Sequence, residues 1–203
     1  HRLAQAGLDH RDVETVLFTH HHLDHVADLP TLAKARYLDD HTDLTVIGPP
    51  GTRELCTRLL GVDNLVDRID LTVTELSPEP EPFELGPHQI KYTQTVHSKP
   101  GFAYGFNSAL TISGDTAPTP AIADLADGSD VLIHECSYPD DVETTTHTTP
   151  TALGAAIQDV DINRLYLTHL FPATESHSEE LTATIADYTD ADIQVATDLD
   201  TLT

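Results

Sequence analysis

The stretch Thr19-His20-His21-His22-Leu23-Asp24-His25 decides the fold, and it directly follows the apolar run 13–18. In an extended segment, side chains two residues apart face the same side, so His20, His22 and Asp24 should converge. A turn would then swing His25 in beside them. Imidazole nitrogens and carboxylates are the ligands that zinc and related divalent metals prefer. So many candidate ligands predict two metals that share the turn, although a solvated or adventitious histidine tract is the competing interpretation.

Further candidate ligands follow the ends of later apolar runs. They are His97, Asp115, His134 with Glu135, and His169. Each run is expected to be a strand, and the carboxyl ends of strands are where α/β folds usually build their sites. One such histidine would commonly be a core residue. The same placement repeated along the chain favours a shared site, because a buried and unpaired imidazole or carboxylate is costly.

In their order along the chain, these motifs resemble those of metallo-β-lactamase-fold hydrolases. The matching segments are the His-x-His-x-Asp-His motif at 20–25, His97, Ser113-Gly114-Asp115-Thr116, His134-Glu135 and Thr168-His169. Within that superfamily the chain is most similar to the ribonuclease Z-like branch. His134-Glu135-Cys136-Ser137 resembles the branch's His-Glu-Ala-Thr motif, and Thr146-His147-Thr148-Thr149 resembles its Gly-His-Ser-Thr motif. The fold that this resemblance implies is α/β, an αββα sandwich of two mixed sheets with helices outside.

The resemblance also implies a metal-binding role for each matching residue. His20, His22 and His97 would hold the first metal, and Asp24, His25 and His169 the second. Asp115 would bridge both. Zinc is the expected metal, and manganese, iron or cobalt would suit the same ligands.

The implied reaction is hydrolysis of a phosphodiester. A hydroxide between the two metals would be the nucleophile, and Asp24 could orient or deprotonate the water. His134, steered by Glu135, would protonate the leaving group as general acid. His147 would contact the phosphoryl oxygens of the substrate, and Lys99 could meet an anionic group.

Two departures from the ribonuclease Z pattern bear on the substrate. After the last histidine, tRNA-processing members continue with Ser-x-Arg-Tyr, whereas this chain reads Leu170-Phe171-Pro172-Ala173. Their long basic arm is also absent from region 71–94, which holds only the short acidic segment 77–82. We therefore expect a small anionic ester as substrate, with RNA disfavoured. The alternatives are hydrolysis of a sulfate ester, carboxylic ester or lactone on the same metals, tRNA 3′-end processing, and metal binding without turnover.

Composition points to the surroundings of the protein. The formal net charge is -24, from 34 acidic and 10 basic residues, and no basic stripe typical of nucleic-acid binders is visible. Abundant aspartate and scarce lysine are typical of a halophile's cytoplasm, where salt screens self-repulsion, so the charge alone argues only weakly against RNA. Cys56 and Cys136 are expected to be buried thiols in a reducing cytoplasm. No apolar run is long enough for a membrane span, and a homodimer is expected by analogy with the branch.

The length of 203 residues predicts a single domain over 1–203. The chain starts with an expected helix at 1–7, so we expect it to be N-terminally incomplete and to lack the first strands of the family's fold. Strands are expected at 13–19, 44–47, 69–76, 90–96, 102–106 and 192–196. Helices are expected at 26–38, 52–60, 121–126, 151–159 and up to Tyr188, with caps at Thr119, Thr149 and a capping box at Ser176. His21 alternates out of phase with its neighbours and should point away from the metals.

Overall fold

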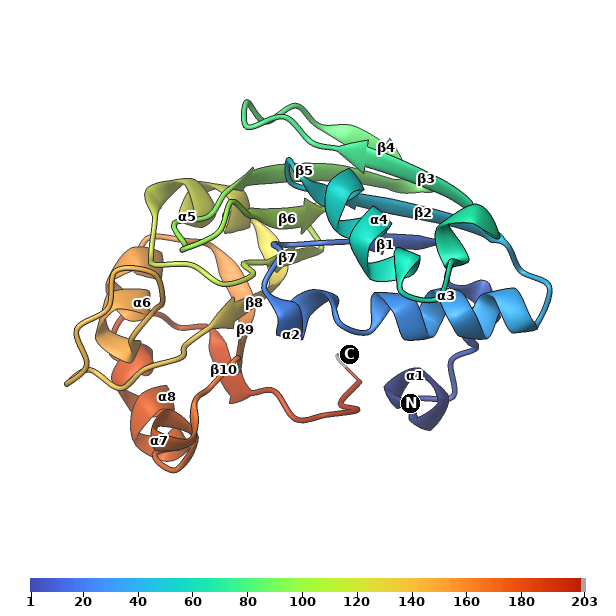
Figure 1. Ribbon diagram of the computed structural model, residues 1–203. Helices are drawn as coiled ribbons and strands as arrows, with labels where there is room; N and C mark the ends of the chain where they lie inside the picture. The colour runs from blue at the N-terminus through green and yellow to red at the C-terminus, as the bar shows by residue number, and fades with distance from the viewer. Residues whose placement is uncertain (202–203) are drawn as a thin grey trace. The chain divides into compact units, whose positions relative to one another are not determined.

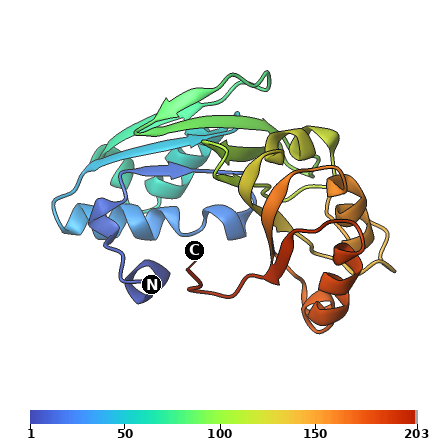
Figure 2. The same ribbon diagram turned by 180° about the vertical axis from the view of Figure 1, so that it is seen from behind.

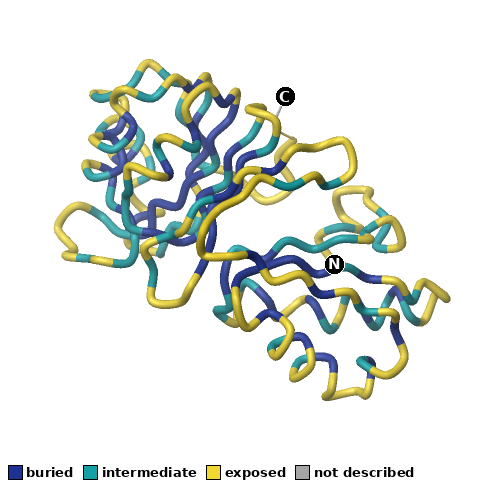
Figure 3. The backbone as a smooth tube through the Cα atoms, turned by 90° about the horizontal axis from the view of Figure 1, so that it is seen from above, coloured by how far each residue is buried: buried dark blue, intermediate teal, exposed yellow. Residues whose placement is uncertain are grey.

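The computed structural model describes residues 1–201, and the chain divides into two compact units (Figure 1). The N-terminal unit comprises His1–Pro78 together with the described residues from Asp198 onward, and the C-terminal unit comprises Glu79–Thr197. The most buried segments include 44–48 in the N-terminal unit and 131–136 in the C-terminal unit (Figure 3). The expectation of one domain stays a prediction.

The N-terminal unit contains a parallel sheet in the order β1-β2-β3. Its strands are β1 (Thr15–Leu17), β2 (Asp43–Gly48) and β3 (Asp70–Glu75), and its helices are α1 (Arg2–Gln5), α2 (Leu23–Val26), α3 (Leu29–Leu38) and α4 (Thr52–Gly61), with short 3-10 turns at His10–Asp12 and Leu65–Asp67. Helices α3 and α4 pack against each other, and α4 also contacts β2 and β3 (Figure 1). Phe18 and Val46 share one hydrophobic core with Cys56 and Leu60 of α4. Most residues of β2 are buried, as is usual for a strand of a parallel sheet.

The C-terminal unit contains a mixed sheet in the order β10-β9-β8-β7-β6-β5-β4 (Figure 2). Its strands are β4 (Phe83–Leu85), β5 (His88–Gln94), β6 (Phe102–Phe106), β7 (Leu110–Ile112), β8 (Ser129–Glu135), β9 (Ile162–Thr168) and β10 (Asp192–Val195), and its helices are α5 (Pro120–Ala126), α6 (Pro150–Ile157), α7 (Pro172–Glu175) and α8 (Ser178–Ala186). Strands β7, β8 and β9 are parallel neighbours, with Ile112 paired to Ile133 and Ile133 to Tyr166. Their carboxyl ends therefore share one edge of the sheet.

Most expected elements are confirmed, and β6 has the predicted bounds. The predicted helix 26–38 is wrong, because the chain forms two helices with a break at residues 27–28. Pro30 explains why a new helix begins at Leu29. Proline lacks an N–H and is tolerated only in the first turn of a helix, and Pro30 lies in the first turn of α3. The hairpin of β5 and β6 around Lys99 is confirmed.

The helix caps are confirmed in part. The Thr119 side chain accepts a hydrogen bond from the Ile122 N–H and caps α5 as predicted. Thr149 precedes α6, but its side chain makes no capping bond. Asp140 accepts from the backbone N–H of Thr151 instead, at 3.0 Å. The capping box at Ser176 is wrong, because its hydroxyl donates to the Ala173 carbonyl at 3.0 Å and α8 begins after His177.

Cys56 and Cys136 are both buried free thiols, as expected. No helix among residues 1–201 is both long and apolar enough to cross a membrane.

Candidate metal centre

The histidine-rich turn of the N-terminal unit brings four candidate ligands together. Pairing of the Phe18 N–H with the Ile47 carbonyl carries the chain to the sheet edge, and α2 begins directly after His22. The Nε2 atom of His20 lies 3.0 Å from Nδ1 of His22, and the rings of His20 and His25 are 4.2 Å apart. His25 Nε2 in turn lies 3.4 Å from an Asp24 carboxylate oxygen. The predicted convergence is therefore present for the rings of His20, His22 and His25, and Asp24 contacts this group through His25.

His21 turns away from this group, as its phase in the sequence predicts. Its Nε2 lies 2.9 Å from the hydroxyl of Thr52 at the start of α4. That hydroxyl donates to the Pro49 carbonyl at 2.6 Å, so it accepts from the His21 ring. Gly51, directly before α4, has a φ of +94°, a backbone conformation that glycine adopts readily. His21 thus anchors the turn to α4.

The C-terminal unit brings together His97, Asp115 and His169. A carboxylate oxygen of Asp115 lies 3.4 Å from Nε2 of His169 and 3.9 Å from Nε2 of His97. The His97 Nδ1–H donates to the Thr146 carbonyl at 2.8 Å, which leaves Nε2 toward Asp115. A tetrahedral ion with bonds of about 2.0–2.1 Å separates its ligand atoms by about 3.3 Å. The spacing and the nitrogen and oxygen donors therefore fit a divalent metal.

His147 joins the same group. Asp115, His147 and His169 each offer a ligand atom, and these atoms lie within 4.8 Å of one another. The His147 ring stacks on that of His169 at 5.7 Å and meets the edge of the His97 ring at 4.8 Å. His169 itself has a φ of 56°, a left-handed conformation that costs energy in residues other than glycine and is concentrated at functional sites.

A buried carboxylate organises this group. Glu135 ends β8 and is 1% exposed. One of its oxygens accepts hydrogen bonds from the Thr116 N–H at 3.0 Å and from Nδ1 of His147 at 2.8 Å. The other accepts from the N–H of Ser137 at 3.0 Å, from the Ser137 hydroxyl at 2.7 Å and from the Thr148 N–H at 3.2 Å. The charge is buried at low cost because both oxygens are fully hydrogen-bonded.

Glu135 holds His134 through its backbone carbonyl and not through its carboxylate, and the role of His134 as general acid stays a prediction. The two residues are consecutive in β8, so their side chains point to opposite faces of the sheet. His134 is 2% exposed, and its Nδ1 donates to the backbone carbonyl of Glu135 at 2.7 Å, while the carboxylate holds His147. Burial lowers the pKa of His134, and the bond to the Glu135 carbonyl opposes this shift.

Several residues of the site were missed by sequence reasoning. Ser137 and Thr148 were quoted as parts of motifs but given no role, and Thr116 and Thr146 contribute through their backbones. Because side chains alternate along a strand, the position of His134 and Glu135 in β8 would have predicted that they point to opposite faces of the sheet. Lys99 is exposed in the loop between β5 and β6, and its contact with substrate stays a prediction.

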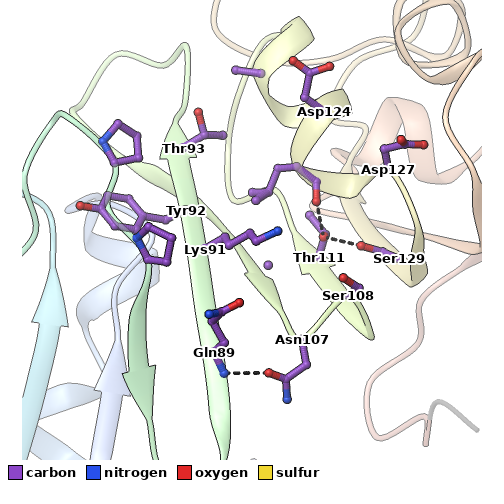
Figure 4. Close-up of a pocket in the computed structure, with 15 residues that line it drawn as sticks. Gln89, Lys91, Tyr92, Thr93, Asn107, Ser108, Thr111, Asp124, Asp127 and Ser129 are labelled. Carbon is purple, nitrogen blue, oxygen red and sulfur yellow. Dashed lines mark hydrogen bonds between the residues drawn. The ribbon is translucent and has the colours of Figure 1, made fainter.

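Two cavities of the C-terminal unit bear on where a substrate would bind. One of about 540 Å³ is lined by His147, Asp140, Glu143 and several threonines. A larger one, of about 730 Å³, lies between β5–β7 and α5 and includes Lys91, Asp124 and the hydrogen-bonded pair Thr111–Ser129 (Figure 4). None of the candidate metal ligands lines the larger cavity, so size alone does not identify the site.

Comparison with known proteins gives consistent matches. A family model described as "Beta-lactamase superfamily domain" matches residues 1–170. Ribonuclease Z of Mycobacterium sp. (strain KMS) is 31% identical over 169 residues, which cover 70% of this chain and 56% of that protein. The chain therefore spans little more than half the length of this relative. Ribonuclease Z of Mycobacterium avium (strain 104) is 27% identical over 88% of this chain and 75% of that protein.

Solved structures share the fold. The metallo-β-lactamase-fold protein YhfI from Bacillus subtilis matches with a TM-score of 0.81 at 20% identity, over 96% of this chain and 79% of that one. The short form of human tRNase Z matches with a TM-score of 0.73 at 19% identity, over 99% and 83%. A diphosphatase of the PhnP family matches with a TM-score of 0.70 at 18% identity, over 97% and 72%. These likenesses confirm the predicted α/β metallo-β-lactamase fold.

Proposed function

The chain belongs to the β-lactamase superfamily, and on that premise we propose that it is a metal-dependent phosphodiesterase of the ribonuclease Z type. One observation carries the proposal: the buried Glu135 carboxylate holds the His147 ring, which stacks on the candidate ligand His169. A proton donor fixed beside a metal ligand is what hydrolysis of an ester with a poor leaving group requires.

The proposed centre uses the ligands assigned by resemblance. His20, His22 and His97 hold one metal, Asp24, His25 and His169 hold the other, and Asp115 contacts both. That the turn of the N-terminal unit and the cluster of the C-terminal unit act as one centre is part of the proposal. It is supported by the superfamily match and by the ligand spacing within each cluster. Zinc fits this donor set, as do manganese, iron and cobalt.

When bound, two divalent ions activate a water molecule at neutral pH and neutralise charge on the phosphoryl group. The chain's own residues do the rest. Asp24, whose side chain is 70% exposed, accepts a hydrogen bond from the attacking water and orients it. His147, protonated on both ring nitrogens before the step, gives its Nε2 proton to the leaving oxygen and keeps its Nδ1–H on Glu135. In this proposal His147 takes the role that the sequence suggested for His134.

The substrate we propose is a small phosphodiester with an uncharged leaving group. The cavity beside His147 carries Asp140 and Glu143, and its lining contains neither lysine nor arginine. Phosphates of an RNA strand would be repelled there. Action in the cytoplasm and a homodimeric state stay predictions.

A second candidate is tRNA 3′-end processing, because the relatives with 27–31% identity are named ribonuclease Z. Against it, the 76–82 connection between β3 and β4 is short and acidic, and Leu170–Ala173 lacks the branch's arginine. Sulfate-ester, carboxylic-ester or lactone hydrolysis would use the same metals. Binding of metal without turnover is the remaining alternative.

Hydrolysis of bis-p-nitrophenyl phosphate by protein loaded with zinc or manganese tests the proposal. We expect turnover that chelation abolishes and metal restores, together with little cleavage of a precursor tRNA. A panel of p-nitrophenyl sulfate, p-nitrophenyl acetate and a lactone separates the ester classes. A protein that contains two metals per chain and hydrolyses none of the phosphodiesters would contradict the proposal.

A further inference from the structure

Ser137 lies two residues beyond the end of β8 and is fully buried. Its hydroxyl oxygen has three polar neighbours. It lies 2.7 Å from a Glu135 carboxylate oxygen, 3.0 Å from Nδ1 of His169 and 3.2 Å from Nδ1 of His147. The hydroxyl of Ser137 therefore lies within hydrogen-bonding distance of the Glu135 carboxylate and of the rings of His147 and His169.

The directions of these hydrogen bonds follow from the number of protons. A serine hydroxyl has a single proton, and the short contact to the acceptor Glu135 takes it. The hydroxyl must then accept from the Nδ1–H of His169. His147 has its own, shorter bond to Glu135, at 2.8 Å. His169 consequently carries its proton on Nδ1 and presents a lone pair on Nε2, whereas His147 keeps a proton on Nδ1 and can carry a second one on Nε2.

We propose that Ser137 is a positioning residue that extends the influence of Glu135 to His169, so that one buried carboxylate holds the Nδ1 proton of both the proton donor His147 and the metal ligand His169. The inference rests on the proposed function for the role of His169 as a ligand. A ring held with its proton on Nδ1 presents Nε2 toward Asp115, 3.4 Å away, and a hydrogen-bonded imidazole is a stronger metal ligand.

The backbone of Ser137 fixes the same turn independently. Its carbonyl accepts from the Phe171 N–H at 3.2 Å and from the Thr174 hydroxyl at 2.7 Å. The neighbouring Cys136 N–H donates to the Thr168 carbonyl at 3.0 Å. These bonds hold the left-handed backbone of His169 without the Ser137 side chain. Removing only the hydroxyl should therefore release the ring and leave the turn in place.

Three variants separate positioning from a merely structural role. Ser137→Ala removes the hydroxyl, and Ser137→Thr keeps it, with the threonine that the similar His-Glu-Ala-Thr motif carries. Ser129→Ala is the matched control, because Ser129 is also buried, at 3% exposure, and its hydroxyl is bonded to Thr111 at 2.9 Å (Figure 4). Circular dichroism and thermal melts of the metal-free chains compare their folding.

Metal affinity is the first measurement, made by chelator competition for zinc and by the absorption spectrum of bound cobalt. We expect Ser137→Ala to weaken the binding of one metal about 10- to 100-fold and to change the cobalt spectrum. Ser137→Thr and Ser129→Ala should stay within about threefold of the parent protein, well below that effect. An affinity of Ser137→Ala within the same threefold range would overturn the proposal.

The ring tautomer is the second measurement, by two-bond proton–nitrogen NMR of the metal-free full chain at alkaline pH. We expect the proton of His169 on Nδ1 in the parent protein and in Ser137→Thr, and a mixture of tautomers in Ser137→Ala. A parent His169 with its proton on Nε2 would overturn the proposal, even if Ser137→Ala failed to fold. Neither measurement uses turnover, so a failure of phosphodiester hydrolysis would be seen separately.

Discussion

The two clusters of candidate ligands are built in opposite ways. In the N-terminal unit, all of them come from one turn, and neighbours in the sequence are neighbours in space. In the C-terminal unit, the ligands come from segments as far apart as His97 and His169, and they meet because β7, β8 and β9 run parallel to one edge. The turn is specified by spacing, whereas the second cluster is specified by topology and by a network around Glu135.

The candidate ligands of the two clusters also differ in how firmly the surrounding structure holds them. The side chains of His97 and Asp115 are 2% and 5% exposed, and His97 is held by its bond to the Thr146 carbonyl, so we expect the C-terminal cluster to be arranged before metal binds. Asp24 in the turn is 70% exposed. We therefore expect mutations in the C-terminal cluster to have the larger effects.

The largest effect is expected for Asp115→Ala, because this carboxylate lies beside both His97 and His169. The variant should lose one or both metals, with affinity at least about 100-fold lower, beyond the usual effect of a supporting residue. Elemental analysis of the purified chain measures this. Asp124→Ala, an exposed carboxylate of the same unit, is the control and should keep the parent metal content. If the Asp115→Ala variant still contained two metals per chain, Asp115 would not be the residue that bridges them.

The next effect compares His147→Gln with His134→Gln. We expect His147→Gln to retain metal and to lose about 10²- to 10⁴-fold in kcat, because a general acid contributes that much. His134→Gln should keep activity within about tenfold and lose about 1–3 kcal/mol of unfolding free energy, the cost of disturbing a buried hydrogen bond. Steady-state kinetics and urea unfolding measure the two outcomes. If His134→Gln lost kcat and His147→Gln kept it, His134 would be the general acid.

A smaller effect is expected for His21→Ala in the turn. Loss of its bond to Thr52 should weaken metal binding about tenfold, the low end for residues that support ligands. Chelator competition measures this, with His41→Ala as control because His41 is exposed. Unchanged affinity would mean that the turn is ordered without its anchor to α4.

The smallest effect concerns pH. Burial lowers the pKa of His134 in the folded chain, so below about pH 6.5 the unfolded chain binds more protons and stability falls with decreasing pH. This histidine should contribute a slope of up to about 1.4 kcal/mol per pH unit. Urea unfolding of the metal-free parent and of His134→Gln at pH 7.5, 6.5 and 5.5 measures it. The parent should lose its advantage over the variant as pH falls, and parallel curves would show that His134 is not buried in its neutral form.

The fold was predicted because the motifs resemble those of a known family in their order along the chain, and the candidate ligands were found because histidine spacing and apolar runs leave periodic signals. The histidine spacing gave the turn, and apolar runs placed Asp115 and His169 at strand ends. The pairing of Glu135 with His147 left no such signal, because it depends on where the 139–149 loop returns to the sheet. Adjacency in sequence suggested His134 as the partner, although alternation in a strand separates consecutive side chains. The break before α3 was missed because helical periodicity continues across it.

Three of the five donors to Glu135 are main-chain amides, those of Thr116, Ser137 and Thr148. Amide chemistry is the same whatever side chain a residue carries, so this scaffold tolerates sequence drift at its contact points as long as the backbone path is kept. The exposed residues 141–143 between Tyr138 and His147 are then free to vary in length and composition. Randomising that segment is a direct route to new substrate preferences on an unchanged catalytic frame.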